Sequence, residues 1–527
     1  MTAPAAPRKR PLGFRLLDGI ERVGNTLPHP ITLFTIFAAI VLAASWIAAQ
    51  MGVSAIHPRD GSPIDALNLL DRDGLRRIFT EAVRNFTGFA PLGTVLVAML
   101  GVGIAEASGL MTVVMRGFAM SMPRSLLTAA IVFTGINGSM AGDAAIILLP
   151  PLAAMLFIAV GRHPLVGIAA AFAGVSGGFS ANLLPTILDV LLVGLSQAAL
   201  DASNLLPGYR VNIVGNYWFM LISTPVLTVL GTWITHRFVE PRFGRWSAPQ
   251  SEGAAAGAAG DGSHDAMLAP LTREERRGLL AAGWGLLAVV VLMVALSAPA
   301  GAPLRVEGET PIERLRPLFD SLVVWVLILF FVPGLMYGIV TGKFRNDHDL
   351  AKVSGDTMAT MGVYIVLAFV AGQFVAWFGW SNLGAIMAIS GANGLKAMGL
   401  EGAPLITGLV LFAAFLNLFT SSASAKWAVM STVFVPMFVL LGFTPEGTQA
   451  IYRVGDSCTN MITPLMPYMP FLITYAQRYD AKAGSGTIIA LMVPYTIAFT
   501  IMWTLMLIVF WMFDLPIGPG VGMMLKG

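Results

Sequence analysis

The sequence contains almost no cysteine and little charge. Cys458 is the only cysteine among 527 residues, which excludes a disulfide within the chain. Charged residues make up 12% and hydrophobic residues 56%, a balance foreign to soluble domains of this size. The formal net charge of +3 is too small to indicate nucleic-acid binding. These absences leave an all-α polytopic membrane protein, surrounded by lipid, as the expected fold class.

Signals of catalysis or cofactor binding are also scarce. No Cys/His cluster has metal-ligand spacing, and Gly342-Lys343 lacks the upstream glycine of a phosphate-binding loop. Gly174–Gly178 matches G-x-S-x-G, so an intramembrane serine hydrolase is one alternative. All six histidines fall in loops or at the ends of apolar runs, however, and small residues for close helix crossing explain the motif better. We expect no enzyme, no cofactor and no metal other than a coupling ion.

Long apolar runs indicate about nine transmembrane helices, since a span requires about 20 apolar residues. The runs lie near residues 30–51, 90–110, 164–200, 212–236, 278–298, 318–342, 356–378, 447–476 and 485–513. The first run begins too late and is too long for a cleaved signal peptide, so we interpret it as the first span.

The positions of Arg and Lys predict how the chain is oriented. Basic residues precede the first run and lie between the fourth and fifth, which places residues 1–29 and the linker 246–275 in the cytoplasm. An odd number of spans then places the C-terminus in the periplasm. The linker is rich in Gly and Ala and separates two membrane halves, residues 30–245 and 276–527.

Each half contains two short apolar arms around a polar tip. In the second half the Ser-rich tip 420–427 interrupts residues 403–441, and in the first half the tip 135–143 interrupts residues 126–160. Each arm is shorter than the roughly 20 residues of a span, so we predict two re-entrant hairpins. Polar tips at membrane depth require burial by protein or contact with water, as in a transport site.

A second pattern follows each hairpin. Gly177–Asn182 precedes Pro185 in the first half, while Pro445, Gly455–Asn460 and Pro464 follow one another in the second. We interpret these prolines and glycines as helix breaks that free carbonyls and helix ends to meet a substrate or cation. Because the two hairpins are predicted to enter from opposite sides, the halves form inverted repeats with broken helices.

Several motifs resemble the aminobenzoyl-glutamate transporter (AbgT) family over nearly the whole chain. They are Ser421–Trp427, Val433–Pro436, the Arg453–Pro464 pattern and the opening Gly24–Pro30. The resemblance implies a homodimer in a bacterial inner membrane, with nine spans and two hairpins per subunit. It also implies uptake of p-aminobenzoyl-glutamate or export of sulfonamide antimetabolites. The family positions associated with the transport path match Asp189, Asn417, Trp427, Pro445, Arg453, Asp456 and Pro464.

Three charged residues inside apolar runs are candidate site residues. Arg453 and Asp456 are three positions apart and so share a helical face, where each ion alone would cost roughly 2.5–3.5 kcal/mol. We predict that Arg453 binds a substrate carboxylate and that Asp456 holds its guanidinium and carries a proton or cation. A static ion pair is the alternative. Asp189 is a lone carboxylate suited to carrying a proton, or else a hydrogen-bonded acid at a helix break.

Uncharged polar residues complete the candidate site. Asn182, Asn417 and Asn460 are predicted to offer oxygens to Na⁺ or donors to a ligand, with Na⁺ near Asn182 and Asn460; helix packing is the alternative.

The Ser-rich tip supplies the remaining candidates. Trp427 is predicted to stack on an aromatic ring of the substrate, or else to lie at the membrane interface. Ser422 and Ser424 serve as site hydroxyls, as small residues at a helix crossing, or as both.

These features predict a secondary transporter that works by alternating access and is driven by a Na⁺ or H⁺ gradient. The residues favour an aromatic anion as substrate, and the family resemblance implies an aromatic carboxylate or a sulfonamide of the p-aminobenzoyl-glutamate kind. A Na⁺-coupled transporter of aliphatic dicarboxylates is the main alternative, and a passive channel is another.

Overall fold

The computed structural model describes residues 30–56, 61–121, 123–141, 144–244, 271–307, 314–419, 422–463, 466 and 468–525. The predictions for residues 1–29, for most of the linker 246–275 and for Pro464 lie outside these residues. The described chain is overwhelmingly helical, apart from a short antiparallel ribbon of β1 (Ser54–Ile56) and β2 (Pro63–Asp65).

Eight helical segments of the described chain are long and apolar enough to span a membrane. They are α2 (Pro30–Gln50), α3 with α4 (Arg72–Thr87, Ala90–Ser108), α10 with η4 and η5 (Tyr217–Ile234, Thr235–Val239, Glu240–Arg242), α13 (Arg273–Ser297), α16 (Leu322–Val340), α18 (Gly362–Trp380), α21 (Ala423–Leu440) and α24 (Ser485–Met512). The other helices are α5 (Leu110–Ser121), η1 (Arg124–Leu126), α6 (Leu127–Ile136), η2 (Asn137–Ala141), α7 (Ala144–Ala159), α8 (Pro164–Phe172), η3 (Ala173–Gly177), α9 (Ile187–Ser203), α15 (Arg316–Asp320), α17 (Asp347–Thr360), α19 (Leu383–Ala397), α20 (Gly402–Asn417), α22 (Pro445–Thr459) and α23 (Met469–Gln477).

Two of the nine predicted spans, 164–200 and 447–476, are broken helices. In the first, the helix formed by α8 and η3 ends at Gly177 and helix resumes at Ile187 as α9. In the second, α22 ends at Thr459 and α23 begins at Met469, and the described residues between them are not helical. The fold prediction of broken helices is therefore confirmed, whereas neither run forms one continuous span.

Each predicted hairpin contains two helices that flank its polar tip, α6 and α7 in the first half and α20 and α21 in the second. α21 begins at Ala423, because the Ser422 side chain caps the helix by accepting the N–H of Ala425 at 3.3 Å. This cap makes α21 longer than the predicted arm, and long enough to span a membrane on length alone. The re-entrant path of the hairpins remains a prediction.

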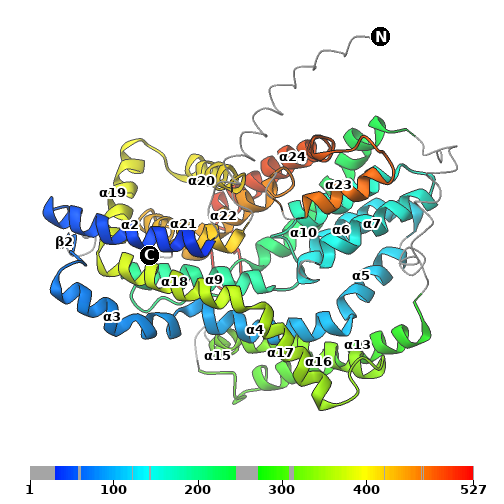
Figure 1. Ribbon diagram of the computed structural model, residues 1–527, viewed down its shortest axis with the longest axis horizontal. Coiled ribbons are helices and arrows are strands. Elements are labelled where there is room, and N and C mark those ends of the chain that lie inside the picture. Colours follow the sequence, from blue (N-terminus) through cyan, green and yellow to red (C-terminus); the bar gives the residue numbers. More distant parts are fainter. Residues whose placement is uncertain are drawn as a thin grey trace, which may run out of the picture.

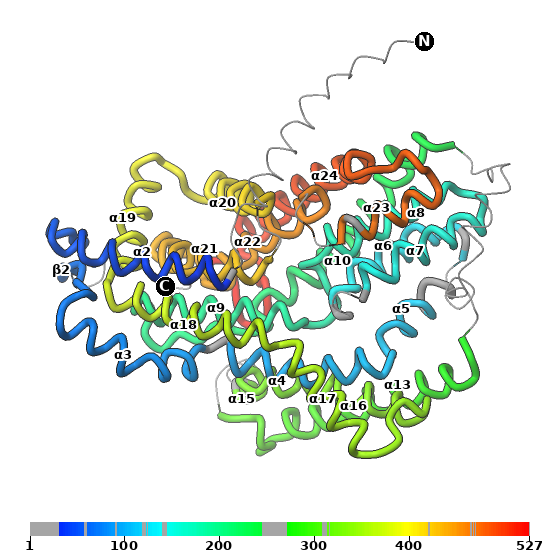
Figure 2. The backbone as a smooth tube through the Cα atoms, viewed as in Figure 1, coloured from blue at the N-terminus to red at the C-terminus, as the bar shows by residue number. Residues whose placement is uncertain are grey.

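The two halves of the chain exchange helices after each break. α9 packs along α21 and also meets α22, although it belongs to the first half. In return, α23 of the second half contacts α7 and α8. Figure 1 shows α9 and α22 near the middle of the view, with α21 on one side and α6 and α7 on the other. The tube in Figure 2 follows the same crossing of the chain. Helices from both halves therefore meet in one central region.

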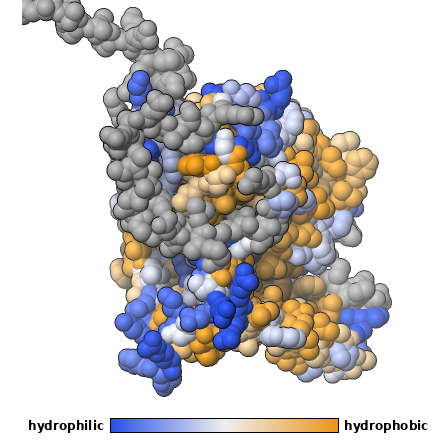
Figure 3. All heavy atoms as spheres, turned by 90° about the vertical axis from the view of Figure 1, so that its right-hand side faces the viewer, coloured by the Kyte–Doolittle hydropathy of each residue, from blue (hydrophilic) through white to orange (hydrophobic). Residues whose placement is uncertain are grey.

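The surface and the centre of the molecule differ in polarity. On α13, Leu280, Trp284 and Val291 are 67%, 67% and 58% exposed, and Figure 3 shows broad apolar areas on one face of the molecule. Such areas suit contact with hydrocarbon. By contrast, α8 and α22 are buried along their whole length.

Candidate substrate-binding site

The buried helix α22 has a polar side. Because an α-helix has 3.6 residues per turn, six of its residues project to one side. They are Glu446, Gln449, Tyr452, Arg453, Asp456 and Ser457. The opposite side contains Gly455, where a Cβ would lie 2.3 Å from the carbonyl oxygen of Val410 on α20. This close approach fixes the rotation of α22, so its polar side faces away from α20.

Arg453 forms a buried ion pair with Asp189, across the two halves of the chain. Asp189 lies in the first turn of α9, where its Oδ2 accepts the backbone N–H of Thr186 at 2.5 Å and the Thr186 hydroxyl at 2.9 Å. Its Oδ1 accepts a hydrogen bond from Nη1 of Arg453. The structure therefore supports the alternative for Asp189, a hydrogen-bonded acid at a helix break. The prediction that Asp456 holds the Arg453 guanidinium is wrong, because Asp189 does so.

The Arg453 guanidinium has one unoccupied edge. Its Nε and Nη2 are buried and have no hydrogen-bond partner, while Nη1 is bound to Asp189. Nε and Nη2 point to the same side of the planar group, and this pair of donors matches the two oxygens of a carboxylate. Asp189 therefore orients the guanidinium and leaves a two-donor edge without a protein partner.

Asp456 pairs with a lysine that the sequence analysis missed. Its Oδ1 lies 2.5 Å from Nζ of Lys426, and both side chains are only 2% exposed. Tyr452 lies beside them, with its hydroxyl 3.2 Å from the same Asp456 oxygen and 2.5 Å from the Ala423 carbonyl. Lys426 was detectable, because a lysine in a hairpin tip predicted to lie at membrane depth is as costly as the arginine that drew attention to α22.

Asn417 connects the second hairpin to α22. Its Nδ2 lies within hydrogen-bond distance of the Asp456 carbonyl (2.6 Å), the Thr459 hydroxyl (2.9 Å) and Oδ1 of Asn460 (2.8 Å). Its Oδ1 accepts from Lys426. Both ends of the Asn417 amide are occupied by protein groups, so the structure supports the packing alternative for this residue.

Asn182 makes an equivalent connection in the first half. Its Oδ1 accepts the Ser139 hydroxyl at 2.7 Å, and Oδ1 of Asn137 accepts the Leu183 N–H at 3.0 Å. The first hairpin turn is thereby tied to the first helix break, as Asn460 ties the second. The amide oxygens predicted to bind Na⁺ are thus hydrogen-bonded to protein here, and the described residues contain no three-residue His, Cys, Asp or Glu group arranged for a metal. The Na⁺ site remains a prediction.

Trp427 is packed between three helices. Its ring stacks on Tyr452, with centroids 4.5 Å apart and planes 27° from parallel. Its indole N–H donates to the Leu192 carbonyl at 3.2 Å and the Ser196 hydroxyl at 3.0 Å, both on α9. The side chain is fully buried. The predicted position at the membrane interface is therefore wrong, and Tyr452 occupies the place that the stacking prediction gave to a substrate ring.

The other predicted residues have local roles. Ser422 caps α21, and its hydroxyl lies 3.4 Å from that of Ser424. Pro185 lies in the non-helical stretch before α9, in agreement with a helix break. Pro445 does the opposite, because it occupies the first turn of α22, where a missing N–H costs nothing. The prediction that Pro445 breaks a helix is therefore wrong.

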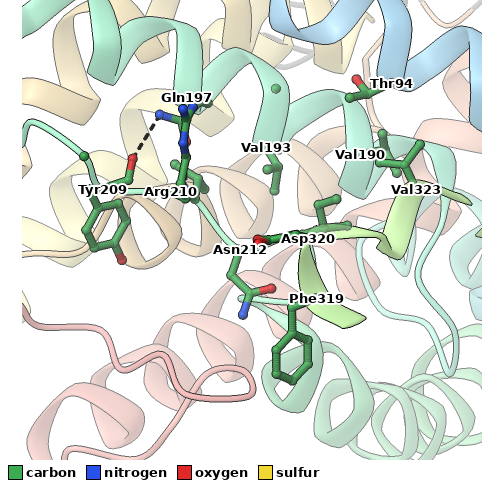
Figure 4. A pocket seen from close by; sticks show the side chains of 14 residues that line it. Thr94, Val190, Val193, Gln197, Tyr209, Arg210, Asn212, Phe319, Asp320 and Val323 are labelled. Atoms are coloured by element: carbon green, nitrogen blue, oxygen red, sulfur yellow. Dashed lines mark hydrogen bonds between the residues drawn. The ribbon is translucent and has the colours of Figure 1, made fainter. Parts of the chain in front are cut away.

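A cavity of about 690 Å³ lies beside α9 (Figure 4). This volume is within the roughly 300–1,000 Å³ typical of small-molecule sites. Val190, next to Asp189, lines the cavity, and the Gln197 amide donates to the Tyr209 carbonyl at 3.1 Å. The full lining is Thr94, Val190, Val193, Gly194, Gln197, residues 208–213, Phe319, Asp320 and Val323.

Glu446 joins the cavity wall to α22. Its two carboxylate oxygens accept the Tyr209 hydroxyl at 2.9 Å and the Asn212 N–H at 2.8 Å. Burial and the negative Glu446 raise the pKa of Tyr209, so its hydroxyl stays protonated and donates. Glu446 was not among the predicted site residues, because it lies just before the predicted apolar run 447–476, whereas Arg453 lies within it.

Comparisons with known proteins find relatives that match nearly the whole chain. The model of the AbgT putative transporter family matches residues 15–525. The chain is 37% identical over 510 residues to the p-aminobenzoyl-glutamate transport protein of Escherichia coli (strain K12), which covers 96% of each protein. It is 42% identical to the solved YdaH transporter of Alcanivorax borkumensis (TM-score 0.85), covering 93% of this chain and all of that one. It is also 42% identical to MtrF of Neisseria gonorrhoeae (TM-score 0.88), covering 96% of this chain and all of that one.

Proposed function

The chain belongs to the AbgT putative transporter family, and on that premise we propose that it carries an aromatic carboxylate or a sulfonamide antimetabolite across the bacterial inner membrane. The chain is a multi-pass membrane transporter. The Escherichia coli relative is named for p-aminobenzoyl-glutamate, and MtrF is described as illuminating a class of antimetabolite efflux pumps. The substrate class proposed for this chain follows those two descriptions.

The observation that carries the proposal is the free edge of Arg453. A buried guanidinium with two unpartnered donors is complete only when an acceptor with two oxygens binds. A substrate carboxylate supplies that acceptor, and a sulfonyl group presents two oxygens in a similar way. Asp189 holds the guanidinium by its third nitrogen, so the donor edge is oriented before the substrate arrives.

Charge balance favours coupling to a cation. Arg453 is neutralised by Asp189, and Lys426 by Asp456. An anionic substrate that enters this buried region therefore brings a charge that neither pair compensates, which is costly at low dielectric. A proton taken up by Asp189 or Asp456, or a Na⁺ ion, would compensate it. We therefore propose that the cation and the anion are bound together and that the gradient of the cation drives transport.

Alternating access is the mechanism that this placement supports best. The ion pair joins α9 and α22, which follow and precede the two helix breaks and come from different halves. A relative movement of the halves would change which side of the membrane reaches Arg453. We further propose a homodimer with a cytoplasmic N-terminus and a periplasmic C-terminus, for which the exposed apolar side of α13 offers a surface to lipid or to a second subunit.

Transport of an aliphatic dicarboxylate is the second candidate function. It is favoured by one observation: Trp427 is already stacked on Tyr452, so the aromatic recognition predicted for it has no support in the geometry. Arg453 would bind a carboxylate of either substrate. The two candidates differ in whether an aliphatic dicarboxylate competes with p-aminobenzoyl-glutamate.

Proteoliposomes test the proposal. Flux of radiolabelled p-aminobenzoyl-glutamate is measured under separately imposed Na⁺ and pH gradients, with succinate as the aliphatic competitor. Arg453→Lys should abolish flux, because an ammonium cannot reproduce the two-donor edge. Arg242→Lys, at an exposed arginine that bonds only the Ala490 carbonyl among the described contacts, is the matched control. Undiminished flux in Arg453→Lys would contradict the site, and flux without either gradient would contradict the coupling.

A further inference from the structure

Gln449 lies one turn before Arg453 on α22 and has no partner. It is fully buried, and neither its amide nitrogen nor its amide oxygen has a hydrogen bond. The buried Gln373 of α18 is different, because it donates to the Ala82 carbonyl at 2.8 Å and accepts from Asn85 at 2.9 Å. Buried amides are normally paired in this way. Gln449 is therefore exceptional within the part of the chain that the structure describes.

The unpartnered atoms near Gln449 form a strip along α22. Residues four apart on a helix are neighbours on its surface, so Gln449, Arg453 and Ser457 line up over successive turns. Five of their polar atoms lack partners: Nε2 and Oε1 of Gln449, Nε and Nη2 of Arg453, and Oγ of Ser457. We call these three residues the α22 strip. By contrast, Oδ1 of Asp456 on the same helix has two partners, Lys426 and Tyr452.

The chemistry of the strip changes along its length. Arg453 offers two donors and no acceptor, which suits a carboxylate. Gln449, about 6 Å away along the helix axis, offers both a donor and an acceptor. A secondary amide has the same combination, since its N–H donates and its carbonyl accepts. A ligand that places a secondary amide beside a carboxylate therefore satisfies both residues at once.

We propose that Gln449 is a specificity-determining residue that recognises the amide group of an N-acylated amino acid while Arg453 binds the adjacent carboxylate. This inference rests on the proposed function, because it assumes that the Arg453 edge holds a substrate carboxylate. It adds a residue that sets specificity among the proposed carboxylates, since p-aminobenzoyl-glutamate is itself an N-acylated amino acid. It also gives a reason why a simple carboxylate binds less tightly: such a ligand leaves the Gln449 amide unpaired.

Paired ligands test the proposal by equilibrium binding to the purified full-length protein. One ligand is p-aminobenzoyl-glutamate, and the other is the ester in which oxygen replaces the amide N–H. The wild-type protein should bind the amide roughly tenfold more tightly than the ester, as expected for one lost hydrogen bond that leaves a buried group unpaired. Gln449→Met, which keeps the length of the side chain, should bind the two ligands equally.

Three further variants separate the possible outcomes. Gln373→Met is the matched control and should keep the wild-type preference. Gln449→Asn keeps an amide but shortens its reach, so it should weaken the preference for the amide ligand over the ester. It serves as the test variant if Gln449→Met does not fold. A Gln449→Met protein that loses affinity for both ligands equally, or that keeps the preference, would overturn the proposal. Arg453→Gln should weaken the binding of both ligands equally. If it weakens the binding of neither, the proposed site itself is wrong, independently of the result for Gln449.

Discussion

Asp189 and Arg453 are 264 residues apart in the sequence and form a buried ion pair between the first and second halves of the chain. The same carboxylate also accepts two hydrogen bonds from Thr186 and so completes the N-terminal cap of α9. One side chain therefore fixes the start of a helix, neutralises a buried cation and leaves the other edge of that cation free.

Asp189→Asn should remove transport and lower stability. The amide oxygen can still cap α9, but Arg453 is left as an unneutralised buried charge, which costs roughly 3–5 kcal/mol. Adding Arg453→Met should recover much of the lost stability without recovering transport. Thermal unfolding in detergent and proteoliposome flux measure the two effects. A single variant as stable as the wild type would show that the pair is not buried as described.

Lys426→Met should destabilise the second hairpin. It leaves Asp456 without its cation and Asn417 without its donor, so we expect the melting temperature to fall. The double variant with Asp456→Leu should melt closer to the wild type, because the two buried charges are removed together. Neither the single nor the double variant should transport. Recovery of flux in the double variant would exclude the Lys426–Asp456 pair from coupling.

Trp427→Phe should lower stability without changing selectivity. Phenylalanine keeps the stacking on Tyr452 but loses the indole hydrogen bonds to α9, at a cost of about 1 kcal/mol. Competition by aromatic and by aliphatic carboxylates should change in parallel. A selective loss of aromatic competitors would instead restore the stacking role that the sequence suggested.

The cavity beside α9 should be accessible to water. In a Cys458→Ala background, Val193→Cys should react with a small charged thiol reagent, because Val193 lines the cavity. Leu192→Cys is the matched control at the next position: Leu192 is fully buried and does not line the cavity, so it should remain unlabelled. Equal labelling at both positions would indicate local unfolding instead of a cavity.

The sequence predicted the membrane class, the broken helices and the polar character of α22, because these depend on local composition and on residue spacing. It did not predict which side chains form the buried ion pairs. Arg453 and Asp456 share a helical face, yet each pairs with a residue of another helix. Residue spacing defines which side chains share a face, but it does not determine which helix packs against that face. The partners of Glu446 were missed for the same reason, because Tyr209 and Asn212 belong to a distant loop.

The exchange of α9 and α23 between the halves has a consequence for biosynthesis. The first half leaves the ribosome with Asp189 in place but without Arg453, and Trp427, which bonds α9, is also still to be made. During synthesis α9 therefore lies in the membrane with the Asp189 carboxylate before its cation partner exists. Neither half can complete its own packing, so the two halves expressed as separate chains should accumulate only when they are produced together.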